Sequence, residues 1–260
     1  MTRYKKTLPY SYHSKPTKPM SFNIAVVYTD RLLLEHKDVW AKATEHILTD
    51  ELSAGSLDLR KLYVYLSQDL KFFEYGLRIV GRAISLCDDY PAANRLAKQA
   101  GFFANDENDY FVNVIKDLKE KLVSDSLFTS ERIQEIDAML FPDVAAYINF
   151  LKSFGTDPSI TYPKVITMMW VMEQVYLDWA TRGVKNFQPD NLHWWYKGWI
   201  DLHYGDDFSS WTQFLKDEVD KCYIKAFKEN DAKTIEDIKS TFLKTADFEG
   251  KFFDETYHYV

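Results

Sequence analysis

Residues 163–180 read PKVITMMWVMEQVYLDWA, a stretch that is apolar on nearly every side of a helix. A helix of this kind needs neighbours all around it, so we expect it to be the central helix of a bundle. Outward from it, from Leu32 to the C-terminus, apolar residues recur at spacings of three and four, and alternating strand-like stretches are missing. The sequence therefore predicts an all-α fold, a multi-helix bundle formed by one domain over residues 30–260.

Glycine, proline and capping residues divide this domain into eight expected helices. Gly55 follows the first, Gly155 and Pro158 end the fourth, and Gly205 with Asp207 separates the sixth from the seventh. The expected helices cover residues 36–53, 58–87, 91–122, 130–153, 163–184, 191–203, 207–229 and 233–258.

Charge and composition narrow the class of partner. The formal net charge is −7, from 39 acidic and 32 basic residues, so the surface should repel nucleic acid. No run of about 18 apolar residues is present, which argues against a membrane partner. The two cysteines, Cys87 and Cys222, are too few for a disulfide framework and suit a reducing compartment. We therefore expect a cytoplasmic protein.

Residues 1–29 differ from the rest of the chain. They contain five Lys or Arg residues and three prolines, and the first acidic residue is Asp30. This composition predicts a flexible basic N-terminal arm. An organellar import signal is the alternative, although such signals are rich in Arg and amphipathic rather than rich in Lys and Pro.

Three carboxylates lie on helix faces that should be buried. Asp69 falls within the apolar stripe of the second expected helix, Glu173 lies in the central helix, and Glu249 is in register with Phe242 and Phe253 near the C-terminus. An isolated buried carboxylate costs several kcal/mol, so each must be paired, be protonated or line a cavity. A structural ion pair or polar network remains the alternative for each acid.

Other polar residues could reach the same interior. Tyr147 and Tyr176 lie on inward rows, Glu107 precedes an aromatic pair, and His203 follows Trp199 on one helix face. Each has an ordinary alternative as a core tyrosine, a cap or a satisfied core polar group. Aromatic walls with a few buried acids favour a flat, amine-bearing heterocycle as ligand.

Five segments, in order along the chain, resemble the TenA family, also called thiaminase II. They are AGSLDLRKLYVYLSQDLKFF at 54–73, ANDENDYF at 104–111, DVAAYINFL at 143–151, YPKVITMMWVMEQVY at 162–176 and ADFEGKFFDETY at 246–257. The resemblance implies a haem-oxygenase-like helical bundle that binds a 4-amino-2-methylpyrimidine, with no cofactor and no metal ion.

The resemblance also implies roles for single residues. Asp69 matches the aspartate that holds the amino edge of the pyrimidine, and Glu249 matches the C-terminal glutamate that handles the proton of the leaving amine. Tyr147 matches an aromatic pocket position, and Phe72 stands where a tyrosine often appears. Glu107, Tyr176 and His203 complete the expected substrate-binding set.

The central helix departs from the better-known branch of the family, which carries a nucleophilic cysteine there. Residues 163–184 contain no cysteine, and Glu173 stands in a W-x-x-E-x-V-Y context that resembles the E-type branch. The implied reaction is hydrolysis of 4-amino-5-aminomethyl-2-methylpyrimidine, or of its N-formyl derivative, toward 4-amino-5-hydroxymethyl-2-methylpyrimidine for thiamin salvage. We expect Glu173 and Glu249 to be the catalytic pair, and the family resemblance implies a homo-oligomer.

Two other functions stay open at this point. A non-catalytic pyrimidine-binding or regulatory protein could keep the same motifs. A di-metal oxidase on the same scaffold needs repeated ExxH pairs, and only Glu255 with His258 has that spacing.

Overall fold

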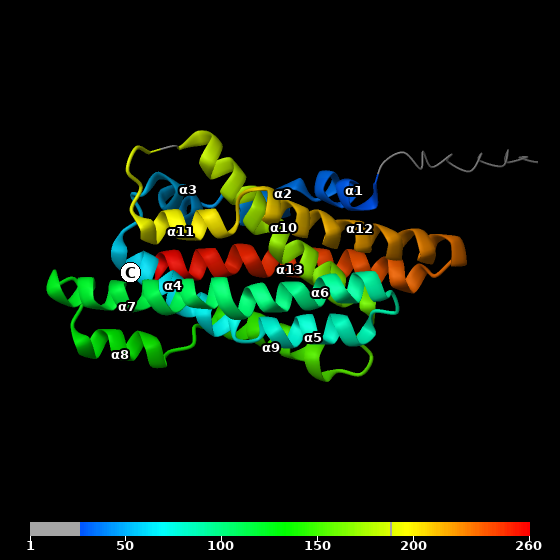
Figure 1. Ribbon diagram of the computed structural model, residues 1–260, viewed down its shortest axis with the longest axis horizontal. Helices are drawn as coiled ribbons and strands as arrows, with labels where there is room; N and C mark the ends of the chain where they lie inside the picture. The colour runs from blue at the N-terminus through cyan, green and yellow to red at the C-terminus, as the bar shows by residue number, and fades with distance from the viewer. Residues whose placement is uncertain (1–26, 188) are drawn as a thin grey trace, which may run out of the picture.

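The structure is a computed structural model that describes residues 27–187 and 189–260. In that part of the chain, helices are joined by short turns and no strand is present (Figure 1). The elements are α1 (Tyr28–Glu35), α2 (Lys37–Thr44), α3 (Ile47–Ala54), α4 (Leu59–Phe73), α5 (Gly76–Leu86), α6 (Tyr90–Phe102), the π-helix η1 (Phe103–Glu107), α7 (Asn108–Ser124), α8 (Ser130–Ala138), α9 (Pro142–Thr156), α10 (Tyr162–Asn186), α11 (Trp194–Leu202), α12 (Asp206–Glu229) and α13 (Ala232–His258).

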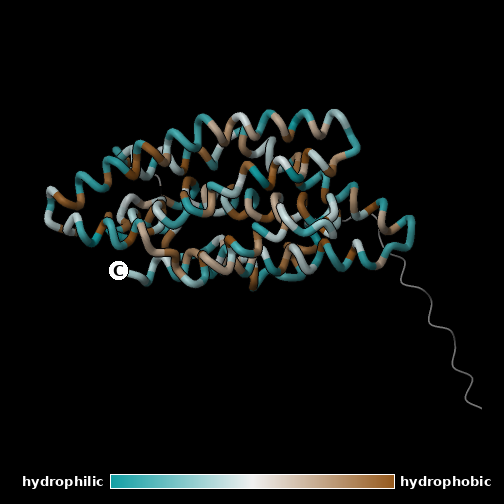
Figure 2. Tube along the Cα trace, turned by 90° about the horizontal axis from the view of Figure 1, so that it is seen from below, coloured by the Kyte–Doolittle hydropathy of each residue, from teal (hydrophilic) through white to brown (hydrophobic). Residues whose placement is uncertain are grey.

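The central helix predicted from residues 163–180 is α10. It contacts α2, α3, α5, α12 and α13, and the large side chains of Trp170 and Trp179 along it are fully buried. Along the surrounding helices, apolar residues alternate with polar ones, as the colouring of Figure 2 shows. The predicted all-α bundle is confirmed.

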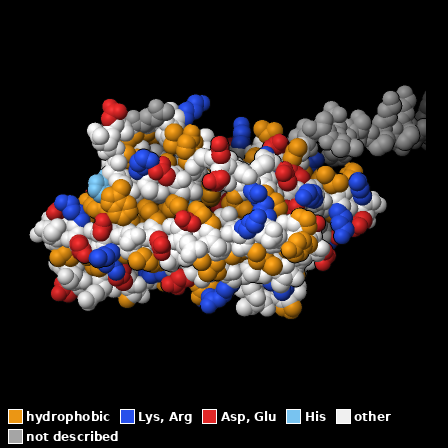
Figure 3. Space-filling view, viewed as in Figure 1, with side chains coloured by type: hydrophobic (Ala, Val, Ile, Leu, Met, Phe, Trp, Pro, Cys, Tyr) orange, Lys and Arg blue, Asp and Glu red, His pale blue; other side chains and the backbone are white. Residues whose placement is uncertain are grey.

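The outer surface carries charge of both signs. Figure 3 shows Lys and Arg side chains interspersed with Asp and Glu across the visible face, with apolar side chains among them. None of the helices in the described part of the chain combines the length and the apolar character that crossing a bilayer requires.

The N-terminal boundary lies earlier than the sequence suggests. Residues 1–26 of the expected arm lie outside the described residues. Its last part belongs to α1, where Tyr28 and Thr29 are buried. The backbone N–H and the hydroxyl of Thr29 donate hydrogen bonds to the two carboxylate oxygens of Asp220, at 3.0 Å and 2.8 Å. These contacts fix α1 against α12.

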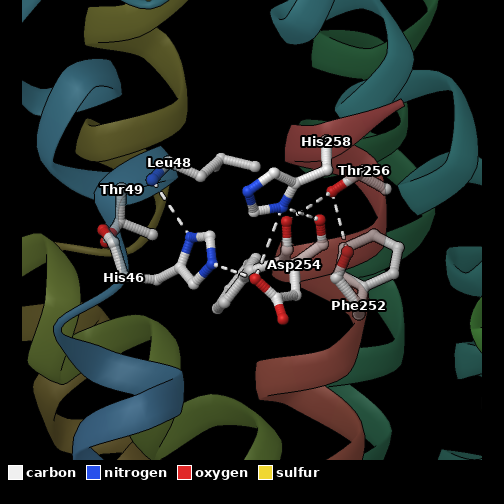
Figure 4. Close-up of polar contacts among 8 residues, drawn as sticks. His46, Leu48, Thr49, Phe252, Asp254, Thr256 and His258 are labelled. Atoms are coloured by element: carbon white, nitrogen blue, oxygen red, sulfur yellow. Dashed lines mark hydrogen bonds and ion pairs between the residues drawn. The ribbon is translucent and has the colours of Figure 1, made fainter. Parts of the chain in front are cut away.

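The first expected helix, 36–53, was wrong as a single element because a histidine caps a new helix inside it. His46 has extended backbone, and its Nδ1 accepts the backbone N–H of Leu48 at 3.1 Å (Figure 4). The imidazole proton therefore sits on Nε2, which lies 3.3 Å from Oδ1 of Asp254 on α13. His258 reaches Asp254 from the other side. The chain turns at His46, and α3 leaves in a new direction.

Two other expected helices are also divided. The range 58–87 forms α4 and α5, with the break at Glu74 and Tyr75. The range 130–153 forms α8 and α9, because Pro142 starts α9 and keeps the preceding Phe141 in extended backbone. The side chain of Glu255 on α13 then accepts the first free N–H groups of α9.

The range 91–122 is helical throughout, but it is not regular. It contains α6, η1 and α7, and the wider turn of η1 covers residues 103–107. Its two ends, Phe103 and Glu107, are buried, whereas the three residues between them are exposed. π-turns of this kind occur often at functional sites.

Candidate active site

A hollow opens among α4, α5, η1, α10, α13 and the C-terminal end of α11. The space between its atoms, with open solvent at the mouth included, is about 620 Å³. Aromatic and aliphatic side chains form most of its wall. Its lining includes four carboxyl groups and one imidazole, from Asp69, Glu107, Glu173, Glu249 and His203, together with the phenol of Tyr176 and the indole of Trp199. No Lys or Arg is among the described residues that line it.

Asp69 lies on the buried face of α4, where the helical spacing places it in line with Tyr65. The hydroxyl of Tyr176 donates to Oδ2 of Asp69 at 3.4 Å, and the hydroxyl of Tyr65 donates to that of Tyr176 at 3.4 Å. The Trp199 indole N–H donates to Tyr65 at 3.0 Å and completes the chain. Burial raises the pKa of Asp69 to about 7, although the two tyrosine hydroxyls oppose that rise.

Glu249 enters the hollow from α13. It is 1% exposed, and the Tyr147 hydroxyl donates to its Oε1 at 2.5 Å. Burial raises the pKa of Glu249 to about 8, the Tyr147 hydrogen bond lowers it, and the charges of Asp69 and Glu173 raise it further. Tyr147 does not itself line the hollow. It lies behind Glu249, and its ring stacks on that of Phe248 at a centroid distance of 4.9 Å.

Glu173 reaches the hollow from the central helix. Met169, Met172 and Tyr176 on the same helix line the wall around it. Burial raises the pKa of Glu173 to about 7, and the nearby indole of Trp211 opposes that rise. A carboxyl group whose pKa lies near neutrality can accept or donate a proton at physiological pH.

Glu107 and His203 form the opposite wall. Nδ1 of His203 lies 2.8 Å from the carbonyl oxygen of Trp199, so Nδ1 carries the proton. Burial lowers the pKa of His203 to about 4, and the imidazole is neutral at pH 7. Its Nε2 lies 3.8 Å from Oε1 of Glu107. Burial, together with the charges of Glu173 and Asp69, raises the pKa of Glu107 well above its usual range.

Seven of the eight residues expected in the site line one hollow, and Tyr147 contacts it through Glu249. The seven are Asp69, Phe72, Glu107, Glu173, Tyr176, His203 and Glu249. The sequence did not single out Phe103 or Trp211 as site residues. Trp199 was visible in the sequence as the residue four positions before His203, on the same helix face, whereas nothing in the sequence marks the contact between Trp211 and Glu173.

The chain offers no metal-binding arrangement within residues 27–187 and 189–260. No three His, Cys, Asp or Glu side chains there come close enough together to hold an ion. The one ExxH spacing has a structural use, because Glu255 accepts the backbone N–H groups of Asp143 and Val144 at 2.9 Å and 3.1 Å. His258 is exposed and contacts Asp254.

Sequence comparison links the chain to one protein family. The sequence profile of the TENA/THI-4/PQQC family matches residues 34–259. No protein of curated function matches the chain.

Solved structures share the fold. A TenA homologue from P. horikoshii OT3 superposes with a TM-score of 0.71 at 20% identity, covering 89% of this chain and 99% of that one. A protein described as a TenA family transcription regulator, from Silicibacter sp. TM1040, has a TM-score of 0.70 at 16% identity, covering 88% and 96%. A protein described as a tena-like thiaminase, from Sulfolobus solfataricus P2, has a TM-score of 0.60 at 19% identity, covering 89% and 96%. At these identities the likeness concerns the fold.

Proposed function

The chain belongs to the TENA/THI-4/PQQC family, and from that membership and its acid-lined hollow we propose that it is an aminopyrimidine hydrolase of thiamin salvage. Its substrate is 4-amino-5-aminomethyl-2-methylpyrimidine or the N-formyl derivative, and its end product is 4-amino-5-hydroxymethyl-2-methylpyrimidine. The observation that carries the proposal is the convergence of Asp69, Glu173 and Glu249, from three different helices, in one aromatic hollow.

The hollow suits the ring of this substrate. A flat pyrimidine can pack against Phe72 and Tyr176, both of which line the wall. Asp69 is held in place by the Tyr176 hydroxyl, so a carboxylate oxygen is directed to accept the exocyclic amine of the ring. The acids around the hollow and the lack of a lining Lys or Arg favour a ligand that carries hydrogen-bond donors.

Glu173 and Glu249 supply the acid and the base. The pKa of Glu249 is raised to about 8, so this group is mostly protonated at pH 7 and can give its proton to the leaving amine. The pKa of Glu173 is raised to about 7, so this group is half ionised and can take a proton from water. The water oxygen bonds to the methylene carbon, the carbon–nitrogen bond breaks, and ammonia leaves with the proton.

Direct attack by water fits the composition of the hollow. Neither Cys87 nor Cys222 lines it, so no thiol is present to form a thioether intermediate. The N-formyl derivative needs one more hydrolysis. Water adds to the formyl carbon, the carbon–nitrogen bond of the amide breaks, the nitrogen takes up a proton that comes from that water, and formate leaves behind a free amine.

The test is turnover by the purified full chain. We expect ammonia release from the aminomethyl pyrimidine, or formate release from its N-formyl derivative, with the hydroxymethyl pyrimidine identified by mass. Glu173→Gln should abolish most of that turnover. Asp178→Asn is the matched control, since Asp178 lies on the same helix outside the hollow. Absence of turnover of both compounds would refute the proposal.

A regulatory role is the second candidate, because one protein of the same fold is described as a TenA family transcription regulator. The acidic net charge and the mixture of charge signs in Figure 3 give little support for a direct contact with nucleic acid. Thermal stabilisation by an aminopyrimidine without any product would favour this candidate over the hydrolase.

A further inference from the structure

Trp211 on α12 has a buried indole N–H without a partner. The residue is 3% exposed, and its Nε1 has no hydrogen bond to any described residue. Buried N–H groups are normally paired, because a donor that is removed from water without an acceptor costs free energy. The indole therefore needs an acceptor that the side chains do not supply in their present arrangement.

The carboxyl group of Glu173 is the acceptor nearby. The helix that carries it, α10, packs along α12. The indole of Trp211 lies close enough to oppose the rise that burial causes in the pKa of Glu173, and Trp211 is the one described residue whose hydrogen-bonding group bears on that pKa. The two groups are therefore neighbours, although the N–H does not reach an oxygen with the geometry of a hydrogen bond.

The indole is held in place, whereas the glutamate can turn. The ring of Trp211 stacks on that of Phe214 at a centroid distance of 5.6 Å and an interplanar angle of 26°. Glu173 borders the hollow and is only partly buried, and its unbranched side chain has more rotatable bonds than the tryptophan. A rotation of the carboxyl group towards α12 can therefore complete the hydrogen bond.

An ionised carboxylate needs that donor more than a neutral carboxyl group does. Where water is largely excluded, hydrogen bonds are what stabilise the charge of a carboxylate. Asp69 has the hydroxyl of Tyr176 at 3.4 Å, and Glu249 has the hydroxyl of Tyr147 at 2.5 Å. The N–H of Trp211 can give Glu173 the same support when that group loses its proton.

We propose that Trp211 is a positioning residue for the base of the reaction, because its indole N–H donates to the carboxylate of Glu173 once Glu173 is ionised. The inference rests on the proposed function, since it deepens the part that Glu173 plays there. Trp211 does not line the hollow, so it acts on the substrate only through Glu173. The hydrogen bond holds the carboxylate in one orientation and favours the ionised form over the protonated form.

Other titratable groups face Glu173 across the hollow. They are Asp69 on α4, Glu107 on η1, Glu249 on α13 and His203 after α11. The residues of α5 that line the hollow are Gly76, Ile79 and Val80, none of which titrates. A substitution of Trp211 changes none of these groups, so a change in the pH dependence can be assigned to the indole.

The first test is the pH profile of the purified full chain. Trp211→Phe removes the N–H and keeps an aromatic ring, so the pKa of Glu173 should rise. Since Glu173 must be ionised to act as base, the acidic limb of kcat should move up by about one pH unit. The expected loss of kcat is then about tenfold at pH 6 and about twofold at pH 8. Equal losses at the two pH values would mean that Trp211 acts only in packing, and would overturn the proposal.

Trp195→Phe is the matched control. Trp195 is also buried, its Nε1 also has no partner, and it does not line the hollow. This variant should keep kcat within about twofold of wild type at both pH values. An acidic limb that moves in the control as well would show that loss of any buried indole causes the shift, and would contradict the role of Trp211.

Heteronuclear NMR of the indole N–H groups gives a readout that needs neither turnover nor a folded Trp211→Phe variant. In the wild-type chain, the Nε1–H resonance of Trp211 should move downfield as the pH rises through about 7, the raised pKa of Glu173. Glu173→Gln should abolish that titration. A wild-type Trp211 resonance that stays in place between pH 5.5 and pH 8.5 would overturn the proposal and leave the hydrolase standing. A titrating resonance in a chain that turns over neither pyrimidine would support the hydrogen bond and refute the hydrolase.

Discussion

Glu173 and Asp178 lie five residues apart on α10, and their carboxyl groups have opposite surroundings. Both oxygens of Asp178 accept a hydrogen bond, Oδ2 from the Trp40 indole at 2.8 Å and Oδ1 from the Gln174 amide at 2.7 Å. Glu173 faces the hollow, and the nearby Trp211 indole N–H has no hydrogen-bond partner. Burial raises the pKa of both acids.

The pair shows that burial alone does not mark a functional acid. Each oxygen of Asp178 already accepts one short hydrogen bond, and the bond from Trp40 connects α10 to α2. Glu173 lines the hollow, where a substrate or a water molecule can lie. A raised pKa therefore becomes a sign of function only when the carboxyl group also borders a cavity.

The largest expected effect is on turnover. Glu173→Gln should lower kcat by about 10²- to 10⁴-fold, because an amide can neither take nor give the proton. Asp178→Asn should stay within about threefold of wild type. Steady-state assays of ammonia or formate release measure both. A Glu173→Gln enzyme with more than about a tenth of wild-type turnover would remove the distinction between the two acids.

The pH dependence of turnover sharpens the comparison. Glu173 must be ionised to act as base, so activity should fall as the pH drops below about 7, the raised pKa of Glu173. Glu249 must be protonated to act as acid, so activity should fall as the pH rises above about 8. Each limb should approach tenfold per pH unit. The two apparent pKa values belong to the coupled pair. A profile that is flat from pH 6 to pH 9 would contradict these roles.

Substitution of Tyr147 should have a smaller effect on turnover, through its contact with Glu249. Tyr147→Phe removes the hydroxyl that donates to Glu249, and that hydrogen bond lowers the pKa of Glu249. We expect about a tenfold loss of kcat, because the glutamate loses the contact that fixes its position. The alkaline limb of the pH profile should move to higher pH. Loss of activity with an unmoved alkaline limb would mean that Tyr147 acts only in packing.

The sequence could predict which acids face inward but not that they line one hollow. The stripes of apolar residues around Asp69, Glu173 and Glu249 identified three inward-facing carboxylates, since helical periodicity determines which face of each helix turns inward. Asp69 and Glu249 are buried, and Glu173 is partly buried. Whether three inward faces share one hollow depends on how helices far apart in the sequence pack. The resemblance to a known family supplied that link.

Local irregularities were harder to predict. The π-turn that places Phe103 and Glu107 on one wall has no strong signal in ANDENDYF, because a turn of five residues interrupts the 3.6-residue period only briefly. The break at His46 depends on a hydrogen bond between an imidazole and a backbone N–H, and histidine is not among the usual capping residues. Pro142 did carry a signal, since the residue before a proline avoids helical backbone.

Substitutions of Glu173 and Asp178 should change the free energy of unfolding in opposite directions. An acid whose pKa is raised on folding binds more protons in the folded state, so its contribution to stability falls as the pH rises from its unfolded value toward the folded one. At pH 8, Glu173→Gln should therefore raise the free energy of unfolding by about 1 kcal/mol. Asp178→Asn should lower it by about 1 to 2 kcal/mol, because asparagine cannot accept both hydrogen bonds. Urea unfolding at pH 6 and pH 8 measures both, and changes of the same sign would contradict the comparison.

The smallest expected effect concerns the cap at His46, which is remote from the hollow. Burial lowers the pKa of His46, while Asp254 opposes that shift, so the folded state favours the neutral ring whose Nδ1 caps α3. The stability from this cap is present above pH 6.5 and is lost as the pH falls below it.

His46→Asn keeps a capping side chain that does not titrate, and His46→Ala removes the cap at a cost of about 1 kcal/mol. The buried ring of His203 is also neutral, so His203 contributes to the loss of stability between pH 7 and pH 5 as well. We therefore compare the size of that loss in wild type with its size in each variant. A smaller loss in both variants, with turnover unchanged, is expected. An equal loss in all three proteins would mean that protonation of His46 does not break the cap.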